Sequence, residues 1–405
     1  MKRSSLVMQI KVCHIAHQSW PSVCGSVSRL ENILAAQKKS GIDVFVISSP
    51  FQAGETSARI ERNNGVEYYR CNSNHHGSEG IKNHRTLLER MKRGLSIISY
   101  TRNVIDICKR ENPDIIHAHA TFLMGIPALI AGFILKKRVV YEMRSTWEDD
   151  IHGGAFINFQ RRMIKLIESF TGSKSDFIFF VSKGIMDHYY PKQPKNYKVI
   201  YNCVLPSQHQ QQASKNSTKL HSFGYIGSIV YYEGLETLIK ATAFLLKQRN
   251  DFQVNIYGDG KERLRLEALA KEVGVSNVIK FHGRVDFSNI QDAYSLIDTI
   301  VLPRKDLPIT QKVAGLKPVE AFAYKKLVLA SDVGGMRELF TDKVHGYLVE
   351  PENHEKLSEF MSLAIDDKLN AKQITTLTFE YYSENFTIES MGSQYLDSYK
   401  KVLGK

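Results

Sequence analysis

A short stretch of the chain brings cations, a helix start and one carboxylate close together. It begins with Lys317 and Pro318, and proline suits the first turn of a helix because it has no N–H to leave unpaired. Outward-facing backbone amides would follow at the positive end of the helix dipole: those of Val319, Glu320 and Ala321. Three more cations precede them: Arg304, Lys305 and Lys312. This arrangement suits a phosphate or diphosphate, and a capped helix with solvated lysines is the plainer alternative.

A carboxylate and several glycines add to this pattern. Glu320 lies one turn inside an apolar segment, where it could accept hydrogen bonds from a ribose diol. Gly334 and Gly335 follow the apolar run 327–331, and they either let the backbone pass close to a ligand or only form a tight turn. Gly25 lies between the first expected strand and the first expected helix, which makes it a second candidate for anion binding.

Two histidines and a charged cluster mark the first half of the chain. His117 and His119 end the run 114–120, and side chains two apart in a strand share a face. A histidine there could meet substrate as donor, acceptor or proton carrier, or be a structural residue. The next run is followed by charged groups and a tryptophan, which suggest a polyol site with Arg144 and Glu148 as candidates.

Motifs for metal chemistry are missing from the sequence. It contains no Asp-x-Asp triplet, no HExxH motif and no Walker A motif, so we expect neither a metal nor another cofactor. Its five cysteines are odd in number and have no CxxC spacing, which favours buried, reduced thiols in a cytoplasmic protein.

Strand and helix patterns alternate along the whole chain. Strands are expected in the first half at 11–17, 43–48, 66–71, 114–120, 138–144, 175–182 and 197–202. Several are apolar throughout, as in a parallel sheet covered by helices on both faces. The polar segment 206–219 is typical of a linker, and the alternation restarts after it. We therefore predict an α/β chain with two doubly wound domains, 1–205 and 206–384, and ligands at the carboxyl ends of their strands.

Composition limits the partners. The 405 residues carry a formal net charge of +12, which favours anionic partners such as phosphates, lipid headgroups or nucleic acid. Nucleic acid is the weakest of these because the basic residues are dispersed and not interleaved with aromatics. No run approaches the roughly 18 apolar residues of a membrane span, and the first residues do not resemble a signal peptide.

Several of these segments together resemble glycosyltransferase family 4, and its bacterial polysaccharide-associated branch most. The donor-side resemblance lies in GYIGSIVYYEGLETLIKA, YGDGKERLRLEALA, LKPVEAFAYKKLVLASDVGGMREL and GYLVEPENHEKLSE. The acceptor-side resemblance lies in PDIIHAHA and VVYEMRSTWEDD. The motifs occur in the family's order and span nearly the whole chain.

The resemblance implies a GT-B fold of two facing Rossmann-like domains, with a final helix, 385–405, returning to the first. It implies retaining, metal-independent hexosyl transfer from a nucleotide diphosphate sugar to a glycan or lipid-linked glycan, in the cytoplasm and at an anionic inner membrane surface. Glu320 would bind the donor ribose and His119 would lie near the donor sugar. The donor-binding loops would contain Gly25, Gly227, Gly334 and Gly335, with Pro318 and Val319 at the phosphates.

The sequence departs from the family's pattern at two places. Lys312 stands where many members have a first glutamate, eight positions before Glu320. The stretch after Gly227 also lacks the usual Arg and Lys that neutralise the diphosphate. We expect Arg304 and Lys317, with Lys312, to replace that pair and act as the catalytic cations together with His119.

Two other functions remain open from the sequence. A nucleotide-sugar epimerase of similar fold would act on the donor alone. A catalytically degenerate scaffold subunit of a polysaccharide assembly complex would fit the missing first glutamate.

Overall fold

The computed structural model describes residues 9–22, 25–52, 58–71, 87–146, 155–204, 220–285 and 289–405. Its contacts divide the chain into two compact units, one formed by 1–201 with 388–405 and the other by 202–387. The sequence-based boundaries were 205/206 and 384/385. Glu148 lies outside the described residues. None of the described helices has the length and apolar character needed to cross a membrane.

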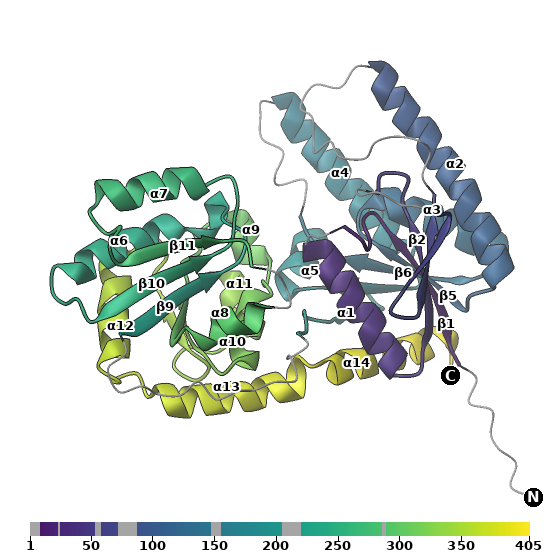
Figure 1. The fold of residues 1–405 in the computed structure, drawn as a ribbon. Coiled ribbons are helices and arrows are strands. Elements are labelled where there is room, and N and C mark those ends of the chain that lie inside the picture. The colour runs from purple at the N-terminus through teal and green to yellow at the C-terminus, as the bar shows by residue number, and fades with distance from the viewer. Residues whose placement is uncertain are drawn as a thin grey trace, which may run out of the picture. The chain divides into compact units, whose positions relative to one another are not determined.

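The first unit contains an eight-stranded sheet in the order β3-β4-β2-β1-β5-β6-β7-β8 (Figure 1). Its strands are β1 (Lys11–Ala16), β2 (Asp43–Ser48), β3 (Ile60–Asn63), β4 (Val66–Arg70), β5 (Ile115–His119), β6 (Arg138–Met143), β7 (Phe177–Phe180) and β8 (Tyr197–Val199). All neighbours pair in parallel except β3 with β4. Strand β5 is buried along its whole length, so its two histidines lie in the core beside its apolar residues.

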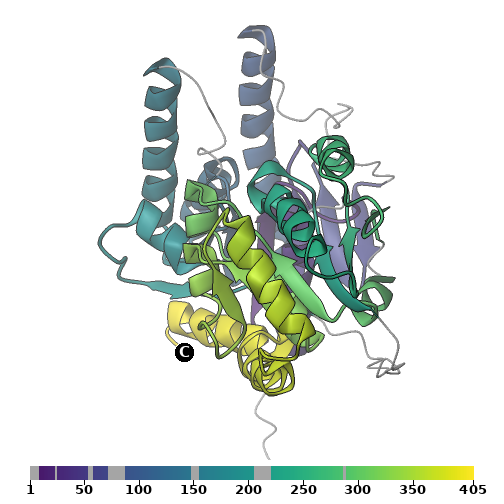
Figure 2. The same ribbon diagram turned by 90° about the vertical axis from the view of Figure 1, so that its left-hand side faces the viewer.

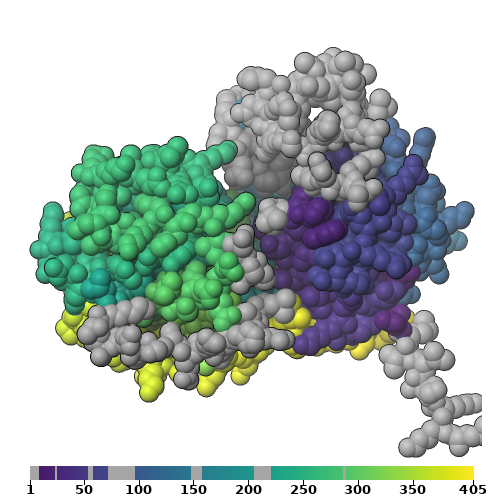
Figure 3. Space-filling model, in the orientation of Figure 1, coloured from purple at the N-terminus to yellow at the C-terminus, as the bar shows by residue number. Residues whose placement is uncertain are grey.

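Helices cover this sheet on both faces. They are α1 (Gly25–Lys39), α2 (Leu87–Glu111), α3 (Phe122–Leu135), α4 (Ala155–Ser173), α5 (Lys183–Tyr189) and the C-terminal α14 (Ile388–Leu403). Helix α14 packs along α1, so the end of the chain belongs to the first unit (Figures 1 and 2). The space-filling view shows the purple N-terminal segments forming much of this unit's visible face (Figure 3).

Edge strand β3 was not predicted from the sequence. It pairs antiparallel with β4 across a two-residue loop, Asn64–Gly65, and both loop residues have positive φ. That conformation is typical of a type I′ hairpin, for which Asn-Gly is the preferred dipeptide. The signal was therefore present in the sequence, but the run 60–63 is polar and has no apolar stripe.

The second unit contains a parallel six-stranded sheet in the order β11-β10-β9-β12-β13-β14. Its strands are β9 (His221–Ile226), β10 (Phe252–Tyr257), β11 (Ile279–Gly283), β12 (Thr299–Leu302), β13 (Leu327–Ser331) and β14 (Tyr347–Val349). Its helices are η2 (Tyr231–Glu233), α6 (Leu235–Leu246), α7 (Arg263–Glu272), α8 (Ile290–Ser295), α9 (Pro308–Lys312), α10 (Lys317–Ala323), α11 (Gly334–Arg337), α12 (His354–Ile365) and α13 (Ala371–Asn385). The predicted α/β class with two parallel-sheet domains is confirmed.

Candidate active site

The second unit's predicted residues gather where its strand order reverses. The chain runs from the central β9 outward to β10 and β11, and then returns to β12 on the other side of β9. Open α/β sheets bind ligands at this switch point, beyond the carboxyl ends of the strands. Gly227 directly follows β9, Arg304 follows β12, and Lys317 begins α10.

Glu233 joins the two predicted cations. The Lys317 Nζ donates to Glu233 Oε1 at 2.6 Å, and the Arg304 Nη2 donates to the same oxygen at 3.3 Å. Arg304 also donates from Nε to Glu233 Oε2 at 3.4 Å and from Nη1 to the carbonyl of Val313 at 3.2 Å. Glu233 and Arg304 are buried, with 2 % and 6 % exposure. One carboxylate thus orients both cations and leaves the trio with a net positive charge.

The cations keep hydrogen-bonding capacity. An arginine has five N–H donors and a lysine three, so the bonds to described residues leave two on Arg304 and two on Lys317. Burial would raise the pKa of Glu233, but Arg304 and Lys317 outweigh burial and lower it to about 2. Burial lowers the pKa of Lys317, although the Glu233 carboxylate opposes this.

Two glycines make room for the cations. A Cβ at Gly227, whose φ is +148°, would collide with Lys317 Cε. A Cβ at Gly315 would collide with the guanidinium of Arg304, although Gly315 has no left-handed φ. The backbone conformation of Gly315 does not require glycine. The absence of a side chain at residue 315 instead leaves room for the Arg304 guanidinium.

Glu320 lies one turn beyond Lys317 on α10. It is half-buried, accepts a 3.3 Å hydrogen bond from the hydroxyl of Tyr294, and has its pKa raised by burial. Its own N–H donates to the carbonyl of Leu316 at 3.1 Å, so the expectation that this amide faces outward was wrong. The helix starts at Lys317, and Pro318 and Val319 are buried in its first turn.

Gly334 and Gly335 lie against α9. A Cβ at Gly334 would collide with the carbonyl of Gln311, and one at Gly335 with the carbonyl of Val313. The amide of Gly334 already donates to Gln311 Oε1 at 2.7 Å. Close packing therefore accounts for both glycines here, and Lys312 ends the helix they pack on.

The first unit's predicted histidines lie at its own switch point, between β1 and β5. His119 is buried, contacts Arg144 Nη2 through Nδ1, and lies 2.7 Å from His14 Nδ1 through Nε2. His14 Nε2 lies 2.9 Å from Gln37 Oε1. The Gln37 amide donates to the Tyr399 hydroxyl at 2.8 Å, and that hydroxyl lies 2.7 Å from His117 Nδ1.

These contacts indicate which atom donates and which accepts in each hydrogen bond of this series. Arginine can only donate, so His119 Nδ1 accepts and its Nε2–H donates to His14. His14 Nε2–H then donates to the Gln37 carbonyl oxygen, which can only accept. Tyr399 accepts from the Gln37 amide, and we infer that its hydroxyl donates to His117 Nδ1, the other described partner of that oxygen. We refer to this series, Arg144, His119, His14, Gln37, Tyr399 and His117, as the histidine relay.

All three imidazoles of the relay are neutral. Burial lowers the pKa of His14 to about 4, and lowers those of His117 and His119 well below their usual range. The His117 Nε2 atom has no hydrogen-bond partner among the described residues and lies 3.6 Å from Glu142 Oε2. Each histidine therefore carries its proton on Nε2.

Glu142 is the buried anion beside the relay. It accepts from Arg144 Nε at 2.7 Å, from Arg29 Nε at 3.0 Å and from the hydroxyl of Tyr395 at 2.6 Å. Burial opposes its charge, but Arg29 and Arg144 outweigh burial and hold the pKa of this carboxyl well below its usual range. Arg144 is thus held by Glu142 on one side and meets His119 on the other.

Two family profiles match the chain in tandem. "Glycosyl transferase 4-like domain" matches residues 25–203, and "Glycosyl transferases group 1" matches 207–378. The structure resembles that of Anabaena HepE in complex with UDP, with a TM-score of 0.71 and 16 % identity, covering 97 % of this chain and all of that one. The chain is a glycosyltransferase of the GT-B fold. The predicted fold and enzyme class are therefore confirmed.

Sequence relatives agree with this assignment. A glycosyltransferase of Methanocaldococcus jannaschii is 23 % identical over 406 residues, covering 96 % of this enzyme and 98 % of that protein. A GDP-mannose-dependent monoacylated α-(1-6)-phosphatidylinositol monomannoside mannosyltransferase of Corynebacterium glutamicum is 29 % identical over 168 residues. That match covers 41 % of this enzyme and 43 % of the mannosyltransferase.

The histidine cluster of the enzyme fits a hydrogen-bonded chain better than a metal site. One ring nitrogen from each of His14, His117 and His119 lies within 4.8 Å of the others. Zinc bonds of about 2.0–2.1 Å in tetrahedral geometry would hold two ligand nitrogens about 3.3 Å apart. The facing nitrogens of His14 and His119 lie 2.7 Å apart, which is a hydrogen-bond distance, and the Arg144 guanidinium beside them would repel a cation.

The remaining predicted residue of the first unit, Gly25, begins α1 and is exposed. Sequence reasoning missed Glu233, Gly315 and the relay members other than Arg144 and the two histidines of β5. Glu233 was visible as a carboxylate in the stretch that lacked the family's cations. Gln37 and Tyr399 gave no signal because they contact each other across 362 residues of sequence.

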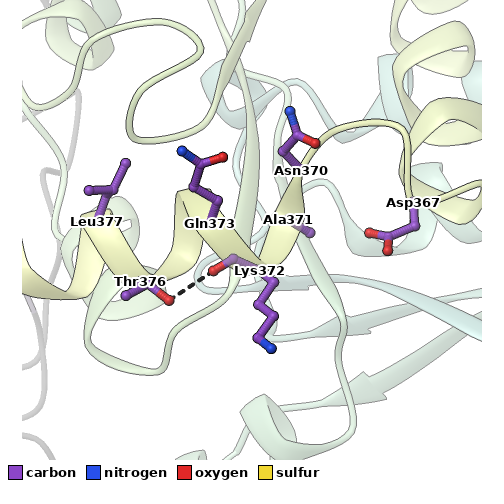
Figure 4. A pocket seen from close by; sticks show the side chains of 7 residues that line it. All are labelled: Asp367, Asn370, Ala371, Lys372, Gln373, Thr376 and Leu377. Carbon is purple, nitrogen blue, oxygen red and sulfur yellow. Dashed lines mark hydrogen bonds between the residues drawn. The ribbon is translucent and has the colours of Figure 1, made fainter.

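A surface hollow of about 470 Å³ lies elsewhere in the second unit (Figure 4). Asp367 and the first turns of α13 line it, and the Thr376 hydroxyl donates to the backbone carbonyl of Lys372 there at 2.8 Å. None of the predicted site residues lines it, and its lining contains one carboxylate and one ammonium group. We assign no part of the reaction to it.

Proposed function

We propose that this enzyme transfers a hexosyl group from a nucleoside diphosphate sugar to a glycan or lipid-linked glycan, with retention of configuration and without a metal ion. The observation that carries the proposal is the Arg304–Glu233–Lys317 trio at the switch point of the second unit. Its free N–H groups suit the oxygens of a diphosphate. The UDP named for the Anabaena neighbour supports a donor of this class.

The trio would act on the leaving group. When the bond from the sugar to the β-phosphate breaks, negative charge grows on a phosphate oxygen, and fixed cations stabilise it. Arg304 and Lys317 supply that charge without moving, because Glu233 already holds them. Glu320, three residues beyond Lys317 on the same helix face, would bind the ribose hydroxyls.

Retention without a nucleophile from the protein favours attack on the same face as the leaving group. A leaving phosphate oxygen would then take the proton of the acceptor hydroxyl as the new glycosidic bond forms, so no side chain needs to act as base. This suits His119, whose two ring nitrogens are occupied by Arg144 and His14. We assign Arg144 to binding the acceptor and His119 to positioning the Arg144 guanidinium.

A lipid-linked acceptor in cell-surface polysaccharide biosynthesis is the acceptor class that we favour. The net charge of +12 favours an anionic surface, and the C. glutamicum relative is named for a phosphatidylinositol mannoside. The enzyme would then work in the cytoplasm, at the inner face of the plasma membrane.

Variants of the trio test the proposal. Lys317→Ala and Arg304→Ala should each lower transfer from the cognate nucleotide sugar by about 100-fold, the scale expected for losing a preorganised charge stabiliser. Lys372→Ala, an exposed lysine of the same unit, is the matched control and should retain wild-type turnover. Chelation by EDTA should leave the rate unchanged.

The same assay separates the proposal from its rivals. Conversion of labelled donor without acceptor would indicate an epimerase, and no turnover with any donor would favour a scaffold. Wild-type turnover in both trio variants, or abolition of activity by EDTA, would refute the mechanism.

A further inference from the structure

Helix α4 exposes an apolar stripe. Its exposed large side chains recur at helical spacing and are Phe159, Met163, Leu166 and Phe170. Between 40 % and 62 % of each is exposed, whereas apolar side chains on a helix usually face the core. Isolated exposed apolar residues are normal, but four on one stripe form a contiguous patch.

Helix α3 extends this patch. It packs against α4 and exposes four more large apolar side chains: Ile126, Ile130, Phe133 and Ile134. Phe133 is 88 % exposed, the highest value among the described large apolar residues. We call these eight residues the α3–α4 surface. Figure 1 shows both helices on the first unit, with α3 between α2 and α4.

The exposed charges carried by α4 itself are basic. Helix α4 carries three cations, Arg161, Arg162 and Lys165, and a single acid, Glu168. Glu168 is 2 % exposed and accepts bonds from the Phe122 amide and the Tyr141 hydroxyl, so it does not offset the cations at the surface. Helix α3 has no charged residue and is followed by the exposed Lys136.

This combination distinguishes an interfacial surface from a membrane span. The 14 residues of α3 are about 21 Å long at 1.5 Å per residue, which is shorter than the roughly 30 Å hydrocarbon core. Apolar side chains beside cations are instead typical of helices that lie in the headgroup region of anionic bilayers. A protein partner would need an acidic rim to match the same charges.

We propose that the α3–α4 surface docks the first unit on an anionic lipid bilayer. This rests on the proposed function in one respect, because a lipid-linked acceptor would be presented at such a surface. The apolar side chains enter the headgroup boundary, and Arg162 and Lys165 contact the anionic headgroups. Docking needs neither donor nor acceptor, so it can be measured apart from transfer.

Vesicle flotation with the full chain tests the proposal. The wild type should float with vesicles of phosphatidylcholine and phosphatidylglycerol, and should bind at least tenfold less to phosphatidylcholine alone or at 0.5 M salt. The double variant Phe133→Glu/Phe170→Glu should lose at least tenfold in binding. Leu264→Glu, which changes an 80 % exposed leucine of α7, is the matched control and should bind as the wild type does.

The remaining outcomes have distinct meanings. Arg162→Glu should weaken binding to anionic vesicles while leaving both apolar helices intact. Light scattering that shows a dimer lost in Phe133→Glu/Phe170→Glu, without vesicle binding by the wild type, would overturn the proposal in favour of a second copy of the chain. If the protein binds vesicles but has no transfer activity, the proposed function is refuted and the docking proposal stands.

Discussion

Arg304 reaches its place because residue 315 has no side chain. A Cβ at this position would collide with the guanidinium, and Gly315 has no left-handed φ that would strain an alanine. Gly315→Ala should therefore fold normally but displace Arg304. Losing one charge-assisted contact of about 1.5–3 kcal/mol should weaken nucleoside diphosphate binding by about 10- to 100-fold, measured by calorimetry.

A double-mutant cycle gives this prediction its control. Because both changes act on the same guanidinium, Gly315→Ala should have no further effect on binding in an Arg304→Ala background. Additive losses in the double variant would show that Gly315 acts through something other than Arg304.

At the residue scale, the sequence pointed to Arg304 and Lys317 but not to the carboxylate that holds them. Arg304 and Lys317 could be proposed because their charge and position are local properties of the sequence. Glu233 was missed because it comes 71 residues before Arg304, and only the folded sheet brings β9 beside β12. Likewise, the packing of Gly334 and Gly335 on α9 was not foreseen because it depends on a tertiary contact.

At the element scale, the C-terminal helix completes the relay of the first unit. Tyr399 of α14 is the only described link between Gln37 and His117. Tyr399→Phe should leave two buried polar groups without a partner and lower the free energy of unfolding by about 1–3 kcal/mol. Nitrogen NMR should show fixed Nε2–H tautomers for His14, His117 and His119 in the wild type, and loss of the fixed tautomer at His117 in the variant.

Tyr231→Phe, on an exposed tyrosine of η2, is the matched control and should change neither stability nor the histidine spectra. An unchanged His117 spectrum in Tyr399→Phe would contradict the relay.

The elements themselves were predictable where burial dominates. The parallel strands of both units were expected because their apolar runs record burial on both faces. Strand β3 is polar and has no apolar run that would predict it. It depends on its Asn-Gly turn and on pairing with β4. The Glu320 amide was expected to face outward, but it donates to the carbonyl of Leu316, which precedes the helix.

At the scale of the whole molecule, the chain length and the alternation of strands and helices predicted two α/β units. One of the two family profiles matches each half of the chain. Donor base, sugar and acceptor do not follow from the fold, because side chains at the strand ends decide them. The account therefore depends on whether a diphosphate binds at the switch point of the second unit.

A crystal structure of the full chain with UDP or GDP measures this most directly. We expect phosphate oxygens about 3 Å from Lys317 Nζ and from a free N–H of Arg304, with no metal ion between them and the ribose at Glu320. A diphosphate bound away from these residues, or held through a metal ion, would contradict the account.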